Sequence, residues 1–260
     1  PVLSLISLNG IFPPIPTPFD SDESINFDKL RSNLTRWNTW PLAGYLVAGS
    51  TGESVSLTGD ERVELVRAVR SAIPSEKLLI AGAGLESTRE TVRLVHRMAE
   101  AGADAVIVVT PSYFAPSIGP GGLLAHYRSI AEASSLPVIL YSVPIYTHLD
   151  LPLEVVRELA THPKVIGIKE SGGSLAKITS LVSQTPDAFQ VLVGSAGLLL
   201  GALIVGAVGC VPALGNLAGN QIHELLVAFQ RGNWEQAREI QARLVEPNEL
   251  LSSRFGVAGV

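Results

Sequence analysis

Cysteine is almost absent from this sequence of 260 residues, in which Cys210 is the single example. One cysteine excludes an internal disulfide framework and a zinc site built from several cysteines. The five histidines are scattered and form no HxH or HExxH motif, so a metal-dependent aldolase or hydrolase is poorly supported and we expect no metal site. Basic residues are not in excess either, and a net charge of −5 indicates no nucleic-acid partner.

Nucleotide-binding and targeting motifs are also missing. No GxGxxG motif follows the first apolar segment and no GK[ST] motif occurs, so both nucleotide fingerprints of open α/β sheets are absent. Residues 1–10 lack the basic region of a signal peptide and the arginines of a transit peptide. We therefore expect a cytoplasmic protein, with a mitochondrial location as the alternative if a transit peptide has been removed.

One long uncharged run could suggest a membrane helix. No charged residue occurs from 191 to 220, and about 20 apolar residues in a row are the usual signature of a membrane span. Glycines and Pro212 interrupt this run repeatedly. We interpret it as a buried strand (189–194), a short helix (196–205) and a second strand (207–213), and expect no membrane partner.

What the sequence does contain is a repeated unit: a short run rich in Val and Ile, then small or turn residues, then an amphipathic helix. The predicted helices include one that begins with a capping box, Thr58 and Glu61, and carries apolar residues on one face. The strands are predicted at 10–16, 44–50, 78–84, 105–111, 138–144, 165–171, 189–195 and 208–214. The helices between them are predicted at 26–40, 58–73, 87–102 and 152–163.

Nearly continuous apolar strands that alternate with helices indicate a parallel sheet covered by helices. Eight such units predict an α/β protein of the (β/α)₈ barrel class, with a doubly wound open sheet as the alternative. We expect the barrel over residues 1–219 and a helical C-terminal extension over 220–260. That extension ends abruptly, so a further helix is expected to be missing.

Function in such a barrel gathers where strands end, and only one predicted strand end carries a lysine, Lys169. Burial disfavours the charged form of a lysine, and a neutral amine can attack a carbonyl to form a Schiff base. The alternative is that Lys169 pairs with Glu170 or another carboxylate. These two readings stay open on the residues alone.

Two other strand ends could complete such a site. Tyr141 ends the neighbouring strand and could move protons, but the residues alone favour a tyrosine that fills the top of the barrel. The turn GSTGES, residues 49–54, could hold a carboxylate with its N–H groups and hydroxyls, or could be a tight turn that caps a helix. His148 follows a strand end, and we interpret it as a residue of the pocket wall.

Four motifs in this order, GSTGES, TPSYF, YSVP and GIKESGG, resemble the dihydrodipicolinate synthase / N-acetylneuraminate lyase family over nearly the whole chain. The resemblance implies Lys169 as the Schiff-base lysine, Tyr141 as the proton-transfer residue, Ser50 as part of the proton relay, and Tyr113 as a tyrosine that reaches into the neighbouring subunit. It therefore implies a homodimer or homotetramer. The substrate-binding residues we expect are Thr51, Gly52, Tyr146, His148, Gly194 and Ser195.

Departures from the family pattern bear on the substrate. Dihydrodipicolinate synthases usually carry YNVPxRTG, whose arginine binds the carboxylate of the aldehyde, whereas this chain has Tyr146 and His148 in YSVPIYTH. The chain resembles 4-hydroxy-2-oxoglutarate aldolase most, although Tyr146 departs from that pattern too. We expect a class I aldolase without a cofactor, holding a covalent imine on Lys169, that cleaves a 4-hydroxy-2-oxo acid to pyruvate and an aldehyde. This substrate could be 4-hydroxy-2-oxoglutarate or a 2-keto-3-deoxy sugar acid.

Three other functions remain open from the sequence. The first is 4-hydroxy-tetrahydrodipicolinate (dihydrodipicolinate) synthase, which joins pyruvate to an aldehyde. The second is a barrel that binds a 2-oxo acid without catalysis. The third is a phosphate-binding isomerase, for which the GSAG segment at 194–197 would be a weak phosphate loop.

Overall fold

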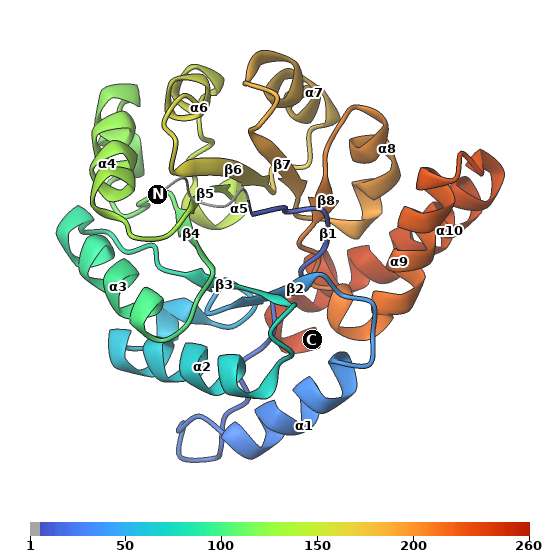
Figure 1. Cartoon of the computed structure of the whole chain (residues 1–260), viewed down its shortest axis with the longest axis horizontal. Helices are drawn as coiled ribbons and strands as arrows, with labels where there is room; N and C mark the ends of the chain where they lie inside the picture. The colour runs from blue at the N-terminus through green and yellow to red at the C-terminus, as the bar shows by residue number, and fades with distance from the viewer. Residues whose placement is uncertain (1–5) are drawn as a thin grey trace.

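The apolar segments predicted as strands form one parallel sheet of eight strands in the computed structural model, which describes residues 6–260 with the side chain of Ser253 excepted. The hydrogen-bonded order is β1-β8-β7-β6-β5-β4-β3-β2. Figure 1 shows these strands as a central ring with helices around it. The strands are β1 (Gly10–Ile11), β2 (Gly44–Val47), β3 (Leu78–Gly82), β4 (Ala105–Val109), β5 (Val138–Ser142), β6 (Val165–Glu170), β7 (Gln190–Val193) and β8 (Gly209–Cys210).

The ring closes between β1 and β2 through an isolated parallel bridge that joins Pro14 and Leu46. Leu46 donates its N–H to Pro13 at 3.0 Å and accepts from the N–H of Ile15 at 2.9 Å. The fold is therefore the (β/α)₈ barrel that the alternation of strands and helices predicts. The strands β1 and β8 are shorter than predicted, because the prolines at 13, 14, 16 and 212 have no N–H to donate to a ladder.

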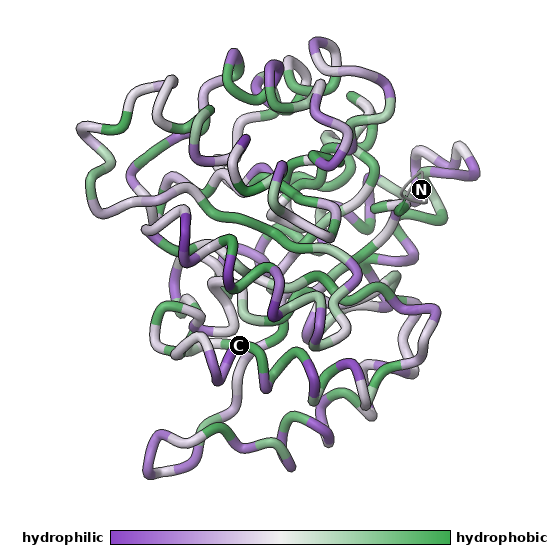
Figure 2. The backbone as a smooth tube through the Cα atoms, turned by 60° about the vertical axis from the view of Figure 1, so that its left-hand side comes forward, coloured by the Kyte–Doolittle hydropathy of each residue, from purple (hydrophilic) through white to green (hydrophobic). Residues whose placement is uncertain are grey.

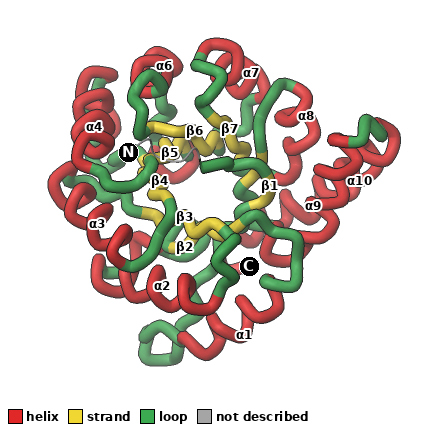
Figure 3. Tube along the Cα trace, viewed as in Figure 1, coloured by secondary structure: helices red, strands yellow, loops and turns green. Residues whose placement is uncertain are grey.

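Helices cover the outside of the ring, as Figure 3 shows. The predicted capping box is confirmed: Thr58 accepts from the N–H of Glu61, and the Glu61 carboxylate accepts from the N–H of Thr58. The helices are α1 (Phe27–Trp37), α2 (Gly59–Ala72), α3 (Thr88–Glu100), α4 (Pro120–Ala133), α5 (Pro144–Thr147), α6 (Leu153–Leu159), α7 (Leu175–Gln184), α8 (Leu199–Ile204), α9 (Gly215–Gln230) and α10 (Trp234–Glu249).

Apolar side chains fill two layers, one between the strands and the helices and one inside the ring. On β5, Val138 and Leu140 belong to the outer layer, whereas Ile139 and Tyr141 belong to the inner one. Figure 2 shows hydrophobic residues along the central strands and hydrophilic residues on the outer turns of the helices. The inner layer fills the ring with side chains, as is typical of such barrels.

An irregularity interrupts the pairing of β5 with β6. Val138 pairs with Val165, but the next residue, Ile139, pairs with Gly167, so Ile166 is an extra residue on β6. Such a bulge changes the direction of the strand locally and resets which residues face inward. Beyond the bulge, Tyr141 and Lys169 are partners in register.

The uncharged run from 191 to 220 forms the end of β7, a short 3₁₀ turn, α8, β8 and the start of α9. No helix within residues 6–260 is both long enough and apolar enough to cross a membrane.

The predicted domain boundary between residues 219 and 220 falls inside α9, close to a kink at Ala218. The division into two domains stays a prediction. Residues 1–5 of the predicted first domain lie outside the described part of the chain. After α10, Leu250–Phe255 form a π-helical turn and Gly256–Gly259 a 3₁₀ turn, so the predicted helical C-terminal extension is confirmed.

Candidate active site

A cavity of about 460 Å³ opens at the carboxyl ends of the strands. Its wall combines the ends of β1, β2, β5, β6, β7 and β8 with residues of α10 and the turns that follow it. Of the residues expected in the site, it brings together Ser50, Thr51, Tyr141, Tyr146, Lys169, Gly194 and Ser195. This is the end of a barrel at which side chains from several strands can act on one ligand.

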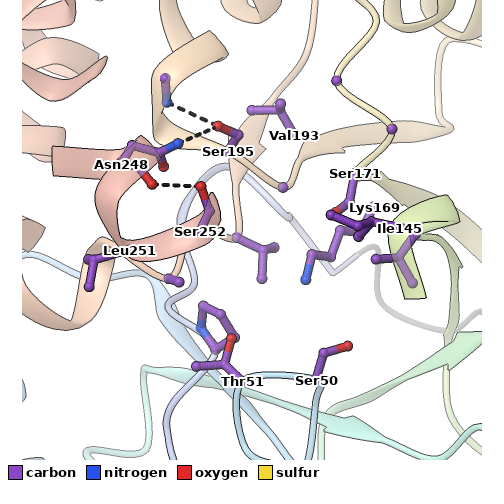
Figure 4. A pocket seen from close by; sticks show the side chains of 18 of the residues that line it. Ser50, Thr51, Ile145, Lys169, Ser171, Val193, Ser195, Asn248, Leu251 and Ser252 are labelled. Atoms are coloured by element: carbon purple, nitrogen blue, oxygen red, sulfur yellow. Dashed lines mark hydrogen bonds between the residues drawn. The ribbon is translucent and has the colours of Figure 1, made fainter. Parts of the chain in front are cut away.

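Lys169 is buried inside this end of the barrel, with a relative exposure of 4%. Its Nζ atom lies 4.1 Å from the centroid of the Tyr141 ring. Figure 4 shows the Lys169 side chain extending into the open centre, with Ser50 and Thr51 on the opposite side. An amine over the face of an aromatic ring is held by the ring and stays available to a ligand.

The alternative reading, an ion pair between Lys169 and Glu170, is not what the structure contains. The Glu170 carboxylate lies on the other side of β6, where its Oε2 atom is 2.9 Å from Lys177 Nζ. Among the described residues, no carboxylate lies within salt-bridge distance of Lys169. Lys169 therefore has no carboxylate partner in the described chain that would account for a structural role.

Ser50 lies beside Tyr141, and the two hydroxyl oxygens are 3.4 Å apart. The loop that carries Ser50 and Thr51 follows β2 in a tight turn, with φ of +52° at Ala48 and +53° at Glu53. Gly52 supports this turn without lining the cavity: its carbonyl accepts a hydrogen bond of 2.7 Å from Thr17 Oγ1.

Tyr146 and His148 follow β5 but have different surroundings. Tyr146 lines the cavity mouth, and burial, with a smaller effect of Tyr141, raises its pKa above the ordinary value. His148 is exposed and is not among the lining residues; it ends the single turn of α5 with φ of +51°. The buried residue there is Thr147, whose hydroxyl donates to the carbonyl of Val143. The reading of His148 as a wall residue therefore finds no support in its placement.

Gly194 and Ser195, at the end of β7, are joined to the C-terminal helix α10. Asn248 donates through Nδ2 to Ser195 Oγ at 3.0 Å, a bond drawn in Figure 4, and accepts through Oδ1 from the N–H of Ala196 at 3.2 Å. Gln241 on the same helix donates to the carbonyls of Ala196 and Gly197. Sequence reasoning missed Asn248 because 53 residues separate it from Ser195, and no local motif marks such a contact.

The loop after β7 also bears on the phosphate-binding alternative. The N–H of Gly194 donates to Glu170, that of Ala196 to Asn248, and that of Gly197 to the Ser195 hydroxyl. A phosphate loop needs free N–H groups. Because these donors are already used within the chain, the segment 194–197 does not have the form of a phosphate loop.

Tyr113 does not line the cavity. Its side chain is 79% exposed and contacts Phe114 edge to face, with ring centroids 4.8 Å apart. The Glu86 carboxylate accepts from the N–H groups of Ser112 and Tyr113 and so fixes this loop. Within one chain, Tyr113 is therefore separated from the other residues of the expected relay.

The charge of the cavity wall is sparse. Among its described lining residues, Lys169 and Glu249 are charged residues of opposite sign, and Glu170 borders the cavity while its buried carboxylate is turned toward Lys177. Within residues 6–260, no cluster of three or more His, Cys, Asp and Glu side chains has the spacing to hold a metal ion.

The fold is thus a (β/α)₈ barrel with a buried lysine and a tyrosine at adjacent strand ends, and among the described residues this lysine has no carboxylate partner. The dihydrodipicolinate synthetase family model matches residues 7–260, and the chain belongs to this family. The family that the four sequence motifs indicate is thereby confirmed.

Individual relatives support the same family assignment. The chain is 36% identical over 243 residues to 4-hydroxy-tetrahydrodipicolinate synthase of Haloarcula marismortui, an alignment that covers 93% of this chain and 78% of that protein. The crystal structure of dihydrodipicolinate synthase DapA-2 from Bacillus anthracis superposes with a TM-score of 0.91 at 33% identity, over 95% of this chain and 84% of that one. A prophage protein of the family from E. coli K12, solved in complex with pyruvate, superposes with a TM-score of 0.90 at 28% identity, over 95% and 85%.

Proposed function

We propose that the protein is a class I enzyme that binds a 2-oxo acid such as pyruvate as an imine on Lys169. The observation that carries this proposal is the buried Lys169 amine beside Tyr141, with no carboxylate within ion-pair distance among the described residues. The neutral amine attacks C2 of the 2-oxo acid, a C–N bond forms, and the carbonyl oxygen leaves as water. The protonated imine then withdraws electrons from C3, which can lose a proton to give an enamine.

The other residues of the cavity fit this reaction. Ser50 and Thr51 face Lys169 across the open space and carry hydroxyls that can donate to the carboxylate of the 2-oxo acid. The Tyr141 hydroxyl, 3.4 Å from Ser50 Oγ, can pass a proton between the substrate and Ser50. Gly52 acts through the shape of the turn, since it does not line the cavity.

We propose that the enamine attacks an aldehyde, so that a C–C bond forms, the aldehyde oxygen takes a proton from Tyr141, and water later releases the product from Lys169. The name of the Haloarcula relative, 4-hydroxy-tetrahydrodipicolinate synthase, supports this direction. It supports the synthase alternative better than the cleavage reaction that the sequence motifs favour.

Cleavage of a 4-hydroxy-2-oxo acid is the second candidate, and one observation favours it. Synthases of the family usually have an arginine where this chain has Tyr146, and the described wall of the cavity has no basic side chain except Lys169. An aldehyde that carries a carboxylate therefore finds no cationic partner there. Tyr146 and Ser195 provide hydroxyls instead, which suit a neutral, hydroxylated aldehyde.

Self-association would complete the site. Tyr113 and Phe114 are exposed together on one loop, and a neighbouring copy could cover them and receive the Tyr113 hydroxyl in its own cavity. We propose a homodimer or homotetramer on this basis. We also propose a cytoplasmic location, since the relatives from Haloarcula marismortui and Listeria monocytogenes come from organisms that have no mitochondria.

The test of the imine is chemical trapping. Pyruvate and borohydride are added, and the mass of the protein and of its peptides is measured. We expect an adduct of reduced pyruvate on the peptide that contains Lys169 and none in Lys169→Ala. An unmodified Lys169 peptide, or turnover retained by Lys169→Ala, would overturn the proposal and favour a barrel that only binds. The direction is then settled by comparing aldehyde-dependent consumption of pyruvate with its release from 4-hydroxy-2-oxo acids.

A further inference from the structure

The outer side of β5 and β6 carries a set of charged and polar side chains directly behind the reactive pair. Ser142 and Glu170 follow Tyr141 and Lys169 in sequence and are likewise partners in register. Because successive side chains of a strand point to opposite faces, they face the helices while Tyr141 and Lys169 face the cavity. Together with Lys177 of α7 and Asp150 of the loop before α6, they form what we call the outer charge cluster.

Glu170 is the centre of the outer charge cluster. Its side chain has no solvent exposure. Its Oε2 atom lies 2.9 Å from Lys177 Nζ and forms an ion pair with it, but it accepts no hydrogen bond from the described residues. Its Oε1 atom accepts from the N–H of Gly172, in the turn that follows β6. A buried carboxylate whose Oε2 atom has no hydrogen-bond donor depends strongly on the one cation beside it.

Lys177 connects this carboxylate to the end of β5. Its ammonium also pairs with Asp150, whose Oδ1 atom accepts from Ser142 Oγ at 2.9 Å. Ser142 in turn accepts from the N–H of Leu151 at 3.2 Å. A chain of direct contacts therefore runs from Glu170 through Lys177 and Asp150 to Ser142, the residue that follows Tyr141.

We propose that Glu170 and Lys177 are positioning residues, which hold the ends of β5 and β6 so that Lys169 and Tyr141 meet a bound 2-oxo acid in reactive geometry. This inference rests on the proposed imine chemistry. It assigns Glu170 and Lys177 no contact with the reacting atoms. Since misplacement of a reacting group by about 1 Å can cost about 100-fold in rate, a shift of the strand ends acts on the chemical step more than on binding.

The test compares rates of imine formation. In Lys177→Met, Glu170 and Asp150 lose their shared cation, and we expect the rate at which pyruvate and borohydride modify Lys169 to fall about 10- to 100-fold, while the pyruvate concentration for half-maximal rate changes little. Glu170→Gln keeps the shape of the side chain and should slow the same step. Lys177→Arg restores a cation and should recover most of the rate.

The matched control is Lys164→Met. Lys164 precedes the opposite end of β6, and its Nζ atom donates to the carbonyl of Glu132 at 3.1 Å, so its loss weakens the same strand away from the cavity. We expect Lys164→Met to form the imine at the wild-type rate even where its melting temperature falls as far as that of Lys177→Met.

Either of two results would overturn the inference: equal slowing in Lys164→Met and Lys177→Met, or a wild-type rate in Glu170→Gln. If Lys177→Met does not fold, Glu170→Gln and Lys177→Arg decide the question in its place. Failure of the proposed function looks different, because wild-type protein would then give no adduct at all.

Discussion

The ring of Tyr141 and the amine of Lys169 lie against each other across β5 and β6, with the nitrogen 4.1 Å from the ring centroid. Neither residue is near the other in sequence, and each stands at the end of its own strand. The pairing of the two strands in register is what brings the amine of Lys169 to the ring of Tyr141.

Tyr141→Phe keeps the ring beside Lys169 and removes the hydroxyl. Because general acid–base catalysis contributes about 10²- to 10⁴-fold, we expect turnover to fall by that factor while borohydride still traps pyruvate on Lys169. Steady-state rates and peptide masses measured on the same preparation check this. Unchanged turnover would assign Tyr141 to packing alone.

Tyr146→Arg tests which aldehyde the cavity accepts. A hydrogen bond to a charged group contributes about 1.5–3 kcal/mol, so the new cation should lower KM for a carboxylate-bearing aldehyde about tenfold or more. Tyr146→Phe removes only the hydroxyl and should leave that KM unchanged. The measurement is KM for a carboxylate-bearing aldehyde and for a neutral aldehyde, in each of the two variants and in the wild-type protein. If Tyr146→Arg affects both aldehydes equally, Tyr146 does not select by charge.

Mixing two inactive variants tests whether Tyr113 completes a neighbouring site. In a mixed dimer of Tyr113→Phe and Lys169→Ala subunits, one site has both Lys169 and a partner's tyrosine. Random reassociation of equal amounts should therefore restore about a quarter of wild-type activity, from one active site in each mixed dimer. Activity is measured before and after dissociation and reassembly. No recovery, with mixed dimers present by mass, would place Tyr113 outside the site.

His126 predicts a dependence of stability on pH. Burial lowers its pKa, with Glu86 acting in the opposite direction, and its Nε2 atom has no hydrogen-bond partner among the described residues. The unfolded chain binds a proton at this position more readily than the folded one, so stability is full above about pH 6.5 and falls as the pH drops below it.

Urea unfolding at about pH 7.5 and about pH 5.5 measures the effect of His126. The difference in unfolding free energy between the two pH values should shrink in His126→Asn. His96→Asn is the control, because His96 is exposed on α3. An unaltered difference in His126→Asn would mean that other groups cause the pH dependence.

The barrel and most of the cavity could be predicted because both follow from short segments of sequence: the alternation of strands and helices, and the residues at each strand end. Each strand end supplies its own residues, and the fold places all carboxyl ends together. The side of β5 on which Tyr141 lies follows from the alternation of a strand. The contact between Glu170 and Lys177 could not be predicted, because it joins a strand to a helix and no periodic pattern in the sequence marks it.

Other features were missed for different reasons. The helix α4 begins at Pro120 and has two glycines in its first turn, so its first turn lacks the apolar periodicity of a helix. The start signal that could have identified it is the proline at the first helical position. The position of His148 after β5 suggests a residue of the pocket wall, but His148 ends α5 in a left-handed conformation and its side chain is exposed. Asn248 joins the site from the far end of the chain, through packing that local sequence does not encode.

The bulge at Ile166 means that the number of residues in β6, as well as their identity, decides which side chains face the cavity. Val165 belongs to the outer apolar layer and Ile166 packs on the inner one, but Ile168 is again outer, so the parity of the strand reverses between them. Strict alternation from Val165 would turn Lys169 toward the helices and Glu170 into the cavity. The same sequence paired with β5 without the bulge would keep every side chain in place along the chain and yet turn a carboxylate, instead of the Lys169 amine, toward the cavity.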